Sequence, residues 1–399
     1  MSLDWLIIGG GIHGVHIAAR LIGESGVDPE RLRIVDPADR LLDRWRTCTA
    51  TTGMQYLRSP SVHNIGLEPH SLRRFAEKRE DQDWRLFTAP YHRPSLDLFN
   101  EHCDQVVDTF GLSDLHVQGR AVSCSVDCHS SGVRLSDGRE LEAQQLVLAI
   151  GAGEQLIWPE WAPRGDHRIR HVFEPGFDGW PTSRETVVVV GGGISAGHIA
   201  LRLLGEGHQV HLVSRHALRQ HQFDSDPSWL GRSKMSSFSR ERDHNRRRTL
   251  ITMARHKGSV PPSIRQRLHE AMSRAELGWH EGQIQGLNLD AGGLELRLST
   301  GVVLEAQRVL LATGFAAGRP GGEMLEELVT SASLPCASCG YPVVSPSLCW
   351  HPRIHVTGPL AELELGPVSR NIVGARLAGD RLVGAARMKS ASHQAGLRS

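Results

Sequence analysis

Long hydrophobic runs are missing from this 399-residue sequence. Its longest apolar stretches have the length of β-strands, whereas a transmembrane helix needs about 18 or more consecutive apolar residues. The N-terminal segment has no basic region, and its apolar residues run directly into glycines, which is typical of a first strand and not of a signal peptide. We therefore expect no membrane attachment and a cytoplasmic location.

An excess of charge of either sign is also missing. The 45 Lys and Arg residues and the 44 Asp and Glu residues give a net charge of +1, which provides no general attraction for nucleic acid or an acidic membrane. The seven cysteines are an odd number in a long chain, which favours reduced thiols over a disulfide framework. The 22 histidines show no H-E-x-x-H or similar spacing, so we expect no metal. A small molecule is the expected partner.

Glycine is abundant, and two groups of glycines have the same pattern. Near the start, L-I-I-G-G-G-I-H-G places Gly9, Gly11 and Gly14 in the spacing G-x-G-x-x-G. In a dinucleotide-binding loop the first glycine makes a tight turn, the second lets the backbone approach the pyrophosphate and the third lets the next helix pack closely. The next predicted strand, R-L-R-I-V-D, ends at Asp36. A carboxylate there suits the hydroxyls of an adenosine ribose.

The second copy follows a run of four valines and differs from the first at two points. It has Gly191 and Gly193, with Ala196 in the third place. The strand H-Q-V-H-L-V that follows its helix leads into Ser214 and Arg215, without an acidic residue. An acid there would repel a 2′-phosphate, whereas Ser and Arg can bind one. The first loop therefore predicts a plain adenosine ribose, and the second predicts NADP(H).

The segments between the loops repeat one order of elements. Residues 116–141 alternate apolar and polar side chains around D-G, which predicts a small β-meander, and a buried strand ending at Gly151 follows. Residues 277–307 repeat the meander, and R-V-L-L-A-T-G-F repeats the buried strand. This is an internal duplication at the level of pattern. The expected fold class is α/β, with two Rossmann-like dinucleotide-binding domains that each carry a small β-meander.

Two dinucleotide loops with L-A-T-G-F after the second resemble the two-dinucleotide flavoproteins. Within these, the sequence most resembles the class B flavin monooxygenases, especially the N-hydroxylating lysine and ornithine monooxygenases. M-Q-Y-L-R-S-P at 54–60 is similar to their Met-Gln and Leu-x-x-Arg-x-Pro segment near the flavin, and 221–229 resembles their substrate-binding segment. Gln307 stands where that family usually has Asp, and Phe315 where it has Tyr. The Baeyer–Villiger fingerprint F-x-G-x-x-x-H-x-x-x-W is absent.

The resemblance implies FAD and NADPH as cofactors. It implies a flavin-dependent NADPH oxidoreductase that passes one oxygen atom from O2, through a hydroperoxide of the flavin, to a nitrogen or sulfur centre of a small molecule. The FAD-binding domain is expected at residues 1–157 with 302–399, and the inserted NAD(P)H-binding domain at 183–301. Residues 158–182, with their proline and tryptophan breaks, are expected to be a linker. A homo-oligomer is left open.

The resemblance also suggests roles for single residues near the flavin. Gln55 and Thr313 are expected to line the pocket where oxygen reacts, and Trp45 either covers the flavin face or belongs to the core. Pro359 stands where flavoproteins often have Asp after Gly, and a helix from Gly366 and Pro367 is expected to point its N–H groups at the flavin. No side chain is assigned as catalytic. The expected cofactor-binding residues are Gly9, Gly11, Gly14, Asp36, Trp45, Gln55, Arg58, Val122, Gly151, Gly191, Gly193, Ser195, Ala196, Ser214, Arg215, Thr313, Gly314, Gly358, Gly366 and Pro367.

Three features leave alternatives open. C-A-S-C at 336–339 is either an ordinary loop, a redox dithiol or half of a zinc site, and a dithiol would favour a reductase of a disulfide or quinone. The basic stretch 232–248 is a solvated helical face or helps to bind the NADP phosphates, because its single aromatic residue argues against nucleic acid. His13, inside the first loop, lies near the flavin or only ends a helix. A flavin-binding regulatory protein without turnover is a further alternative.

Overall fold

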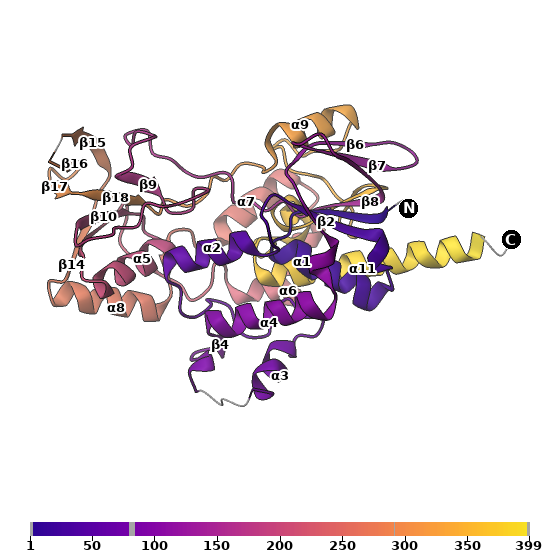
Figure 1. Ribbon diagram of the computed structural model, residues 1–399, viewed down its shortest axis with the longest axis horizontal. Helices are drawn as coiled ribbons and strands as arrows, with labels where there is room; N and C mark the ends of the chain where they lie inside the picture. The colour runs from indigo at the N-terminus through magenta and orange to yellow at the C-terminus, as the bar shows by residue number, and fades with distance from the viewer. Residues whose placement is uncertain (1–2, 80–83, 291, 397–399) are drawn as a thin grey trace.

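The two glycine loops lie in two different lobes of the protein (Figure 1). The computed structural model describes residues 3–79, 84–290 and 292–396. Each loop follows a central strand of its own sheet, and that strand pairs in parallel with both neighbours. The lobes are therefore two versions of one plan.

The first lobe is built on an eight-stranded sheet. Its central strand, L-D-W-L-I-I, is almost wholly apolar and pairs in parallel on both sides, as expected for a strand that is covered on both faces. In spatial order the strands are β19 (Cys349–His351), β20 (Ile354–Val356), β8 (Glu140–Leu148), β1 (Leu3–Ile8), β2 (Leu32–Asp36) and β5 (His116–Gln118), and β6 (Ala121–Val126) and β7 (Ser131–Leu135) continue from β8 as an antiparallel meander.

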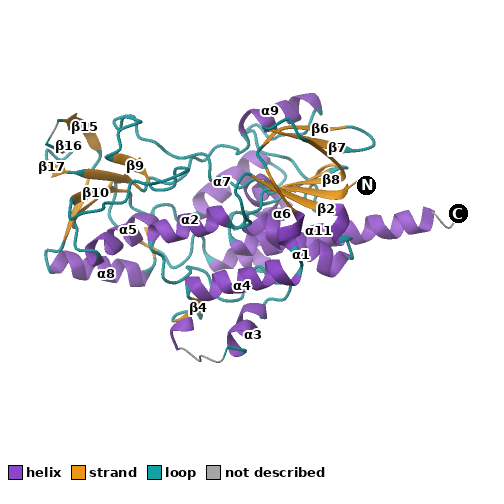
Figure 2. Ribbon diagram, viewed as in Figure 1, coloured by secondary structure: helices purple, strands orange, loops and turns teal. Residues whose placement is uncertain are grey.

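Helices cover both faces of this sheet (Figure 2). The long α11 (Ile372–Gly396) packs along α1 (Ile12–Ser25) on one face, and α9 (Gly322–Ser331) packs against β6 on the other. The chain between β2 and β5 forms α2 (Asp43–Thr52), α3 (Ser71–Glu77), β3 (Phe87–Thr88), β4 (Arg93–Pro94) and α4 (Leu96–Thr109).

The second lobe holds a five-stranded parallel sheet with the valine strand at its centre. The three central valines are fully buried because helices pack on one face and an antiparallel meander on the other. In spatial order the strands are β14 (Leu277–Glu281), β11 (Gln209–Ser214), β10 (Thr186–Val190), β18 (Arg308–Leu311) and β9 (Ile169–His171). The helices are α5 (Ile194–Gly205) and α8 (Pro262–Ser273), and the meander is β15 (Ile284–Leu289), β16 (Leu294–Leu298) and β17 (Val303–Ala306).

The predicted fold class is confirmed, because each sheet has a core of parallel strands and both three-stranded meanders are present. The division into domains remains a proposal, and strand pairing bears on where it is drawn. β9, inside the predicted linker 158–182, pairs with β18, inside the segment 302–399 predicted for the FAD domain, and both belong to the second sheet. A division that follows the sheets assigns both strands to the second lobe. Three-residue strands such as β9 are too short to show an alternating pattern.

One segment of the inserted chain leaves the second lobe. Residues 221–260, here called the docked segment, contain α6 (Arg232–Arg240), α7 (His244–Ala254) and β13 (Ser259–Val260), which pairs with β12 (Arg219–Gln220). In Figure 1, α6 and α7 lie among the elements of the first lobe. Their apolar side chains form a separate small core with the first lobe, made of Trp229, Phe238, Ile251, Tyr341, Leu363 and Val368.

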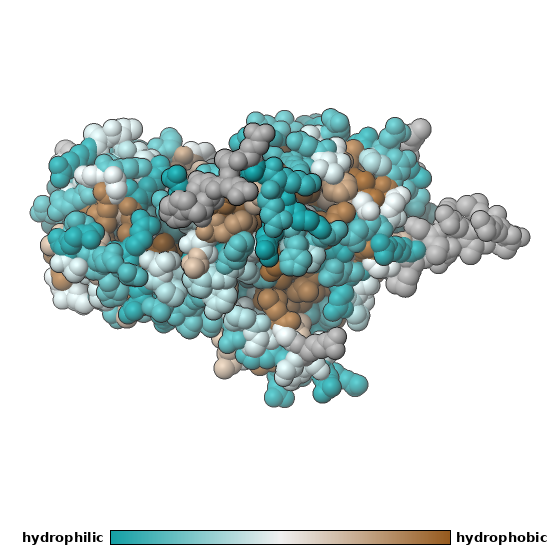
Figure 3. All heavy atoms as spheres, turned by 90° about the horizontal axis from the view of Figure 1, so that it is seen from below, coloured by the Kyte–Doolittle hydropathy of each residue, from teal (hydrophilic) through white to brown (hydrophobic). Residues whose placement is uncertain are grey.

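Apolar side chains are distributed over the helices and over the surface in small groups. Among the described helices, none is both long and apolar enough to cross a bilayer. The face in Figure 3 is mostly hydrophilic, and its apolar side chains are gathered in several small areas.

Because α1 approaches the first loop closely, a methyl group added at Gly14 should destabilise the fold. A Cβ atom on Gly14 would lie 1.8 Å from the carbonyl oxygen of Gly9, so Gly14→Ala should force the helix away from the loop. We expect the free energy of unfolding to fall by about 2 kcal/mol or more, measured by urea denaturation of FAD-free protein. Gly384→Ala is the matched control, because a Cβ there meets no atom within 4 Å. Equal effects of the two substitutions would contradict this packing.

Candidate dinucleotide-binding site

The first glycine loop is held against the ends of three strands. The Gly9 N–H donates to Val35 O at 2.8 Å, and Gly9 has φ of 109°. A Cβ on Gly9 would lie 2.3 Å from the carbonyl oxygen of Ala149, just after β8. Only glycine fits this turn, because both the backbone angle and the space exclude a side chain. The N-terminus of α1 is thereby fixed at the carboxyl edge of the sheet.

The space in front of α1 suits a pyrophosphate. Gly11 is the N-cap residue of α1, and no side chain caps the helix there. A Cβ built on Gly11 meets no atom within 4 Å, although its neighbours in the loop are tightly packed. The first N–H groups of the helix and its positive dipole end therefore face open space, which is the arrangement that binds a phosphate group. The residues of this loop fit FAD.

Asp36 stands beside this space in a fixed orientation. Its carboxylate accepts hydrogen bonds from the N–H of Gly10 at 2.6 Å and of Ala38 at 3.0 Å. The backbone of the meander also reaches it, since the Gly119 N–H donates to Asp36 O at 2.9 Å. Val122, three residues further on, is exposed. Asp36, predicted to contact the ribose, and Val122, predicted to bind the cofactor, thus belong to neighbouring parts of one edge, and their role in binding stays a prediction.

The second loop repeats the geometry with a small difference. A Cβ on Gly191 would lie 2.4 Å from Ala312 O, as a Cβ on Gly9 would from Ala149 O, and 3.1 Å from the methyl group of Ala196, which occupies the third place of this loop. Gly193 is the N-cap residue of α5 and has no side-chain cap. In front of a Cβ on Gly193 the nearest atom is the Cα of Gly258, 3.7 Å away. The loop is open to an anion but bordered by the end of the docked segment.

Ser214 and Arg215 have different environments. Ser214 is 2% exposed, and its hydroxyl donates to His216 O at 2.8 Å and accepts from the indole N–H of Trp279 at 3.3 Å. Its hydrogen-bonding capacity is largely used within the protein. Arg215 is exposed, and no described residue forms an ion pair with it. The residues therefore fit NADP(H) chiefly through Arg215.

The strand ending in L-A-T-G-F forms one side of the junction between the lobes. Phe315 pairs with Leu156 in an antiparallel bridge, and the Ile157 N–H donates to Gly314 O at 3.0 Å. The Thr313 hydroxyl donates to Ile157 O. Thr313 and Gly314 thus lie where two chain segments cross. A ligand in the pocket predicted to include Thr313 would have to compete with Ile157 O for the Thr313 hydroxyl proton.

The segment M-Q-Y-L-R-S-P connects the first lobe to the docked segment. The Arg58 guanidinium donates to the carbonyl oxygens of His221 and Gln222, both at 2.7 Å, and pairs with Asp224 at 2.5 Å. A flavin contact predicted for Arg58 is untested, but its charge is engaged in this bridge. Gln55 is exposed beside it, whereas the Trp45 indole N–H donates to Asn100 at 3.0 Å and its ring packs on Phe99.

The helix predicted from Gly366 and Pro367 begins later, and this prediction was wrong. A short turn of 3-10 helix and α10 (Glu362–Leu365) come first, and α11 begins at Ile372. Gly366, with φ of 74°, ends α10, and the following residues form turns closed by Ser369 N to Gly366 O and Asn371 N to Val368 O. Pro367 stands in these turns, so its fixed φ did not mark the first turn of the long helix.

Sequence reasoning missed a buried charged cluster beside this turn. Glu362 is fully buried and forms ion pairs with Arg248 and Arg255 of the docked segment and with Arg370. Arg370 also donates to the Tyr341 hydroxyl at 2.9 Å. Burial alone would raise the pKa of Glu362, but its hydrogen bonds with Arg370 and the charges of the three arginines lower it. The cluster fastens the docked segment to the first lobe.

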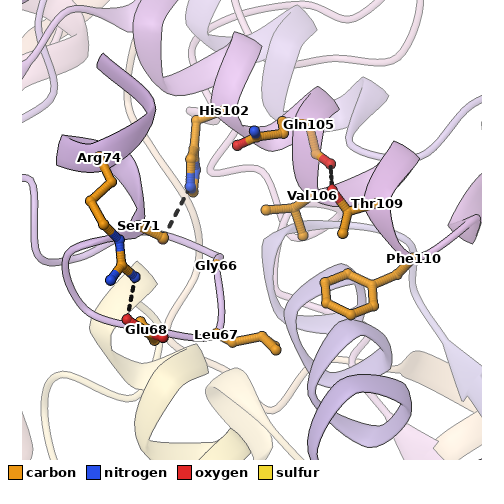
Figure 4. Close-up of a pocket in the computed structure, with 10 residues that line it drawn as sticks. All are labelled: Gly66, Leu67, Glu68, Ser71, Arg74, His102, Gln105, Val106, Thr109 and Phe110. Carbon is orange, nitrogen blue, oxygen red and sulfur yellow. Dashed lines mark hydrogen bonds and ion pairs between the residues drawn. The ribbon is translucent and has the colours of Figure 1, made fainter. Parts of the chain in front are cut away.

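An open pocket of about 230 Å³ lies away from both loops (Figure 4). In it, the His102 Nε2 atom is 3.1 Å from the Ser71 hydroxyl, which in turn donates to Asn64 at 2.8 Å. Burial lowers the pKa of His102 to about 4, so its ring is neutral. None of the predicted cofactor-binding residues lines this pocket. Its lining is Gly66, Leu67, Glu68, Ser71, Arg74, His102, Gln105, Val106, Thr109 and Phe110.

Comparison with known proteins agrees with this geometry. Residues 6–153 match the family model for FAD-NAD(P)-binding domains. The chain shares its fold with N-hydroxylating flavoproteins of known structure. The ornithine hydroxylase of Pseudomonas aeruginosa has a TM-score of 0.76 at 16% identity, covering 97% of this chain and 99% of its own. The ornithine N-hydroxylase of Kutzneria sp. 744 has a TM-score of 0.74 at 14% identity, covering 98% and 100%.

A reductase shares the same fold. The bacillithiol disulfide reductase of Bacillus cereus has a TM-score of 0.64 at 16% identity, covering 98% of this chain and 100% of its own. No curated protein matches the chain. The predicted resemblance to the N-hydroxylating flavoproteins is confirmed for the fold, and the prediction of FAD with a nicotinamide nucleotide is confirmed by the matching domain.

The charged cluster predicts a pH-dependent contribution to stability. Glu362→Gln leaves three arginines facing one another, so the free energy of unfolding should fall by about 3 kcal/mol at pH 7. Because the folded protein lowers the pKa of Glu362 below 4.5, its carboxylate stabilises the fold above that value and loses this effect as the pH falls further. Urea unfolding should therefore show a difference from wild type that shrinks in acid.

Glu326→Gln is the control for this experiment. It removes the partner of Arg319 from a pair in which Glu326 is 70% exposed. Exposed pairs contribute at most about 1 kcal/mol. A Glu362→Gln effect no larger than that of the control, or one independent of pH, would contradict the structural role of the cluster.

Proposed function

We propose that the protein is a FAD-dependent, NADPH-consuming monooxygenase that transfers one oxygen atom from O2 to a nitrogen, or alternatively a sulfur, centre of a small molecule. The observation that carries this proposal is the pair of open, uncapped helix N-termini in one N-hydroxylase-like fold. Asp36 lies beside the first, and Arg215 follows Ser214, which lies against the second loop at Gly192. A plain ribose suits the acid, and a 2′-phosphate suits the arginine.

Each loop has its own task in this proposal. The first loop holds FAD, which supplies hydride acceptance and oxygen activation when bound. The second loop holds NADPH. The N–H groups of Gly11 and its neighbours bind the flavin pyrophosphate, and Arg215 selects the phosphorylated nicotinamide nucleotide. No acid or base catalyst of the protein is required by this assignment.

The docked segment is proposed to close the reaction site against water. Its Gly258 borders the second loop, and its Arg255 donates a hydrogen bond to Pro367 O in the turn before α11. Arg58 of the M-Q-Y-L-R-S-P segment donates a hydrogen bond to its Gln222 O. A segment held at three points would exclude bulk water from the reaction site. Oxygen transfer requires this exclusion, because water would destroy the reactive oxygen species. Residues 221–229 of the docked segment, which resemble the substrate-binding segment of the N-hydroxylating enzymes, are proposed to contact the substrate.

A disulfide or quinone reductase is the second candidate, since a disulfide reductase shares the fold. The thiols weaken it. Cys336 lies 3.9 Å from the Arg319 guanidinium, yet burial raises the pKa of its thiol, which disfavours the reactive thiolate. Cys339 packs in the small core of the docked segment. We therefore assign C-A-S-C to an ordinary loop.

The oxygen requirement separates these candidates. Purified FAD-loaded protein should oxidise NADPH in air, and an amine substrate should raise that rate and yield a hydroxylamine, found by screening amino acids, polyamines and thioethers with H2O2 measured in parallel. The double substitution Cys336→Ser and Cys339→Ser should leave this activity unchanged. Turnover that continues without oxygen and disappears in the double variant would instead establish the reductase.

Arg215 predicts the preference between nicotinamide nucleotides. Arg215→Ala should lower kcat/KM for NADPH, because a charged contact is lost. The decrease should correspond to a loss of about 1–3 kcal/mol of transition-state stabilisation, whereas kcat/KM for NADH should stay nearly unchanged. Arg219→Ala is the matched control, since Arg219 is exposed four residues further along the same segment. Equal losses for NADPH and NADH would refute the NADP assignment.

A further inference from the structure

The His216 ring lies between the second glycine loop and the docked segment. A Cβ atom built on Gly192 would lie 3.0 Å from its Cε1 atom, and one built on Gly258 would lie 2.8 Å from its Nε2 atom. Gly258 also has φ of 64°, which favours glycine. The two missing side chains therefore leave the room that the imidazole occupies. The ring is partly exposed, and it lies beside the open N-terminus of α5.

The two glycine loops differ in the side chains that cover their middle glycine. Around a Cβ built on Gly10, the nearest atoms belong to Leu41 and to Asp36, whose Cγ atom is 3.4 Å away. Around a Cβ built on Gly192, the nearest atom is Cε1 of His216, and its Nε2 atom is 3.5 Å away. The second loop therefore has an imidazole where the first has a carboxyl group and an apolar side chain. In the first lobe this place is the one predicted for the adenosine ribose.

The hydrogen bonds at the two loops differ in the same way. The Gly10 N–H donates to the Asp36 carboxylate at 2.6 Å, whereas the Gly192 N–H has no acceptor among the residues that the structure describes. Ser214 ends its strand as Asp36 does, but its hydroxyl donates to His216 O at 2.8 Å. The second loop thus keeps an N–H donor free at the end of β11. A free donor suits an anion.

One nitrogen of the His216 ring is held by the protein, and the other is available. Nδ1 lies 2.8 Å from Ala217 O, and a carbonyl oxygen only accepts, so Nδ1 carries a proton and donates it. Nε2 forms no hydrogen bond with any residue in the described part of the chain. An imidazole readily takes up a second proton near neutral pH, and it then donates charge-assisted hydrogen bonds to a phosphate. Arg215, exposed and next in sequence, adds positive charge.

We propose that His216 recognises the 2′-phosphate of NADPH; this inference rests on the proposed function. A pyrophosphate at the N-terminus of α5 directs the adenosine ribose of the nucleotide toward the end of β11, where the ring lies. A 2′-phosphate there gains the imidazolium and the Gly192 N–H as donors, whereas the 2′-hydroxyl of NADH offers no charge to either. His216 is thus a specificity-determining residue, and Arg215 supports it with a second positive charge.

The test is the affinity of the FAD-loaded protein for NADP+ and for NAD+, measured by isothermal titration calorimetry. His216→Asp places an acid over Gly192, much as Asp36 lies over the first loop. Its carboxylate should repel the 2′-phosphate and weaken NADP+ binding about tenfold or more, while NAD+ binds at least as tightly as to wild type. His216→Ala should weaken NADP+ binding by about threefold to tenfold and leave NAD+ binding unchanged.

His269→Asp is the matched control. It makes the same change at an exposed position of α8 in the same lobe, and it should keep the wild-type affinity for both nucleotides. Unchanged NADP+ affinity in His216→Asp would overturn the inference. Equal weakening of NADP+ and NAD+ in both His216 variants would show a merely structural role and would also overturn it. Either result leaves the proposed function standing. A wild-type protein that binds NAD+ as tightly as NADP+, or binds neither, would overturn the proposed use of NADPH itself.

Discussion

The whole arrangement depends on how closely a helix can approach the end of the strand before it. In the first lobe Gly14 packs against the carbonyl group of Gly9 so tightly that a methyl group would overlap it. This contact holds the N-terminus of α1 at the carboxyl edge of the sheet, where Asp36, Gly151 and the end of β20 also lie. In the second lobe Ala196 stands at the corresponding position, and Gly191 approaches Ala312 as Gly9 approaches Ala149. The same close contact between strand and helix thus produces both open helix N-termini, each of which can bind an anion.

The docked segment connects the two similar lobes. It belongs in sequence to the second lobe, but its apolar side chains share a core with the first, and Glu362 gathers arginines from both. Arg58 makes a further bridge to its start. Removing the docked segment from the first lobe would have to break the buried charge pairs of Glu362, which is costly. The space between the two nucleotide loops is therefore bordered by chain that is anchored on both sides.

Local patterns made the loops, the meanders and the fold class predictable. The roles of Gly9, Gly14 and Asp36 could be predicted because the strand, the loop, the helix and the next strand follow each other within a short stretch of sequence. The start of α11 at Ile372 was mispredicted, since Pro367 resembled a helix start but lies in turns set by Gly366. The pair of Arg248 and Glu362 joins residues 114 positions apart, and no periodic pattern points to it. Such contacts depend on where α7 docks, which its polar sequence did not show.

Anaerobic mixing of the FAD-loaded protein with NADPH tests the central claim most directly, because it asks whether the two loops serve two cofactors that meet. The visible absorbance of the flavin is followed in time, with NADH in a parallel experiment. One equivalent of NADPH should bleach the flavin fully, and faster than NADH does at equal concentration. Failure to take up FAD, or a bound flavin that neither nucleotide reduces, would contradict this claim.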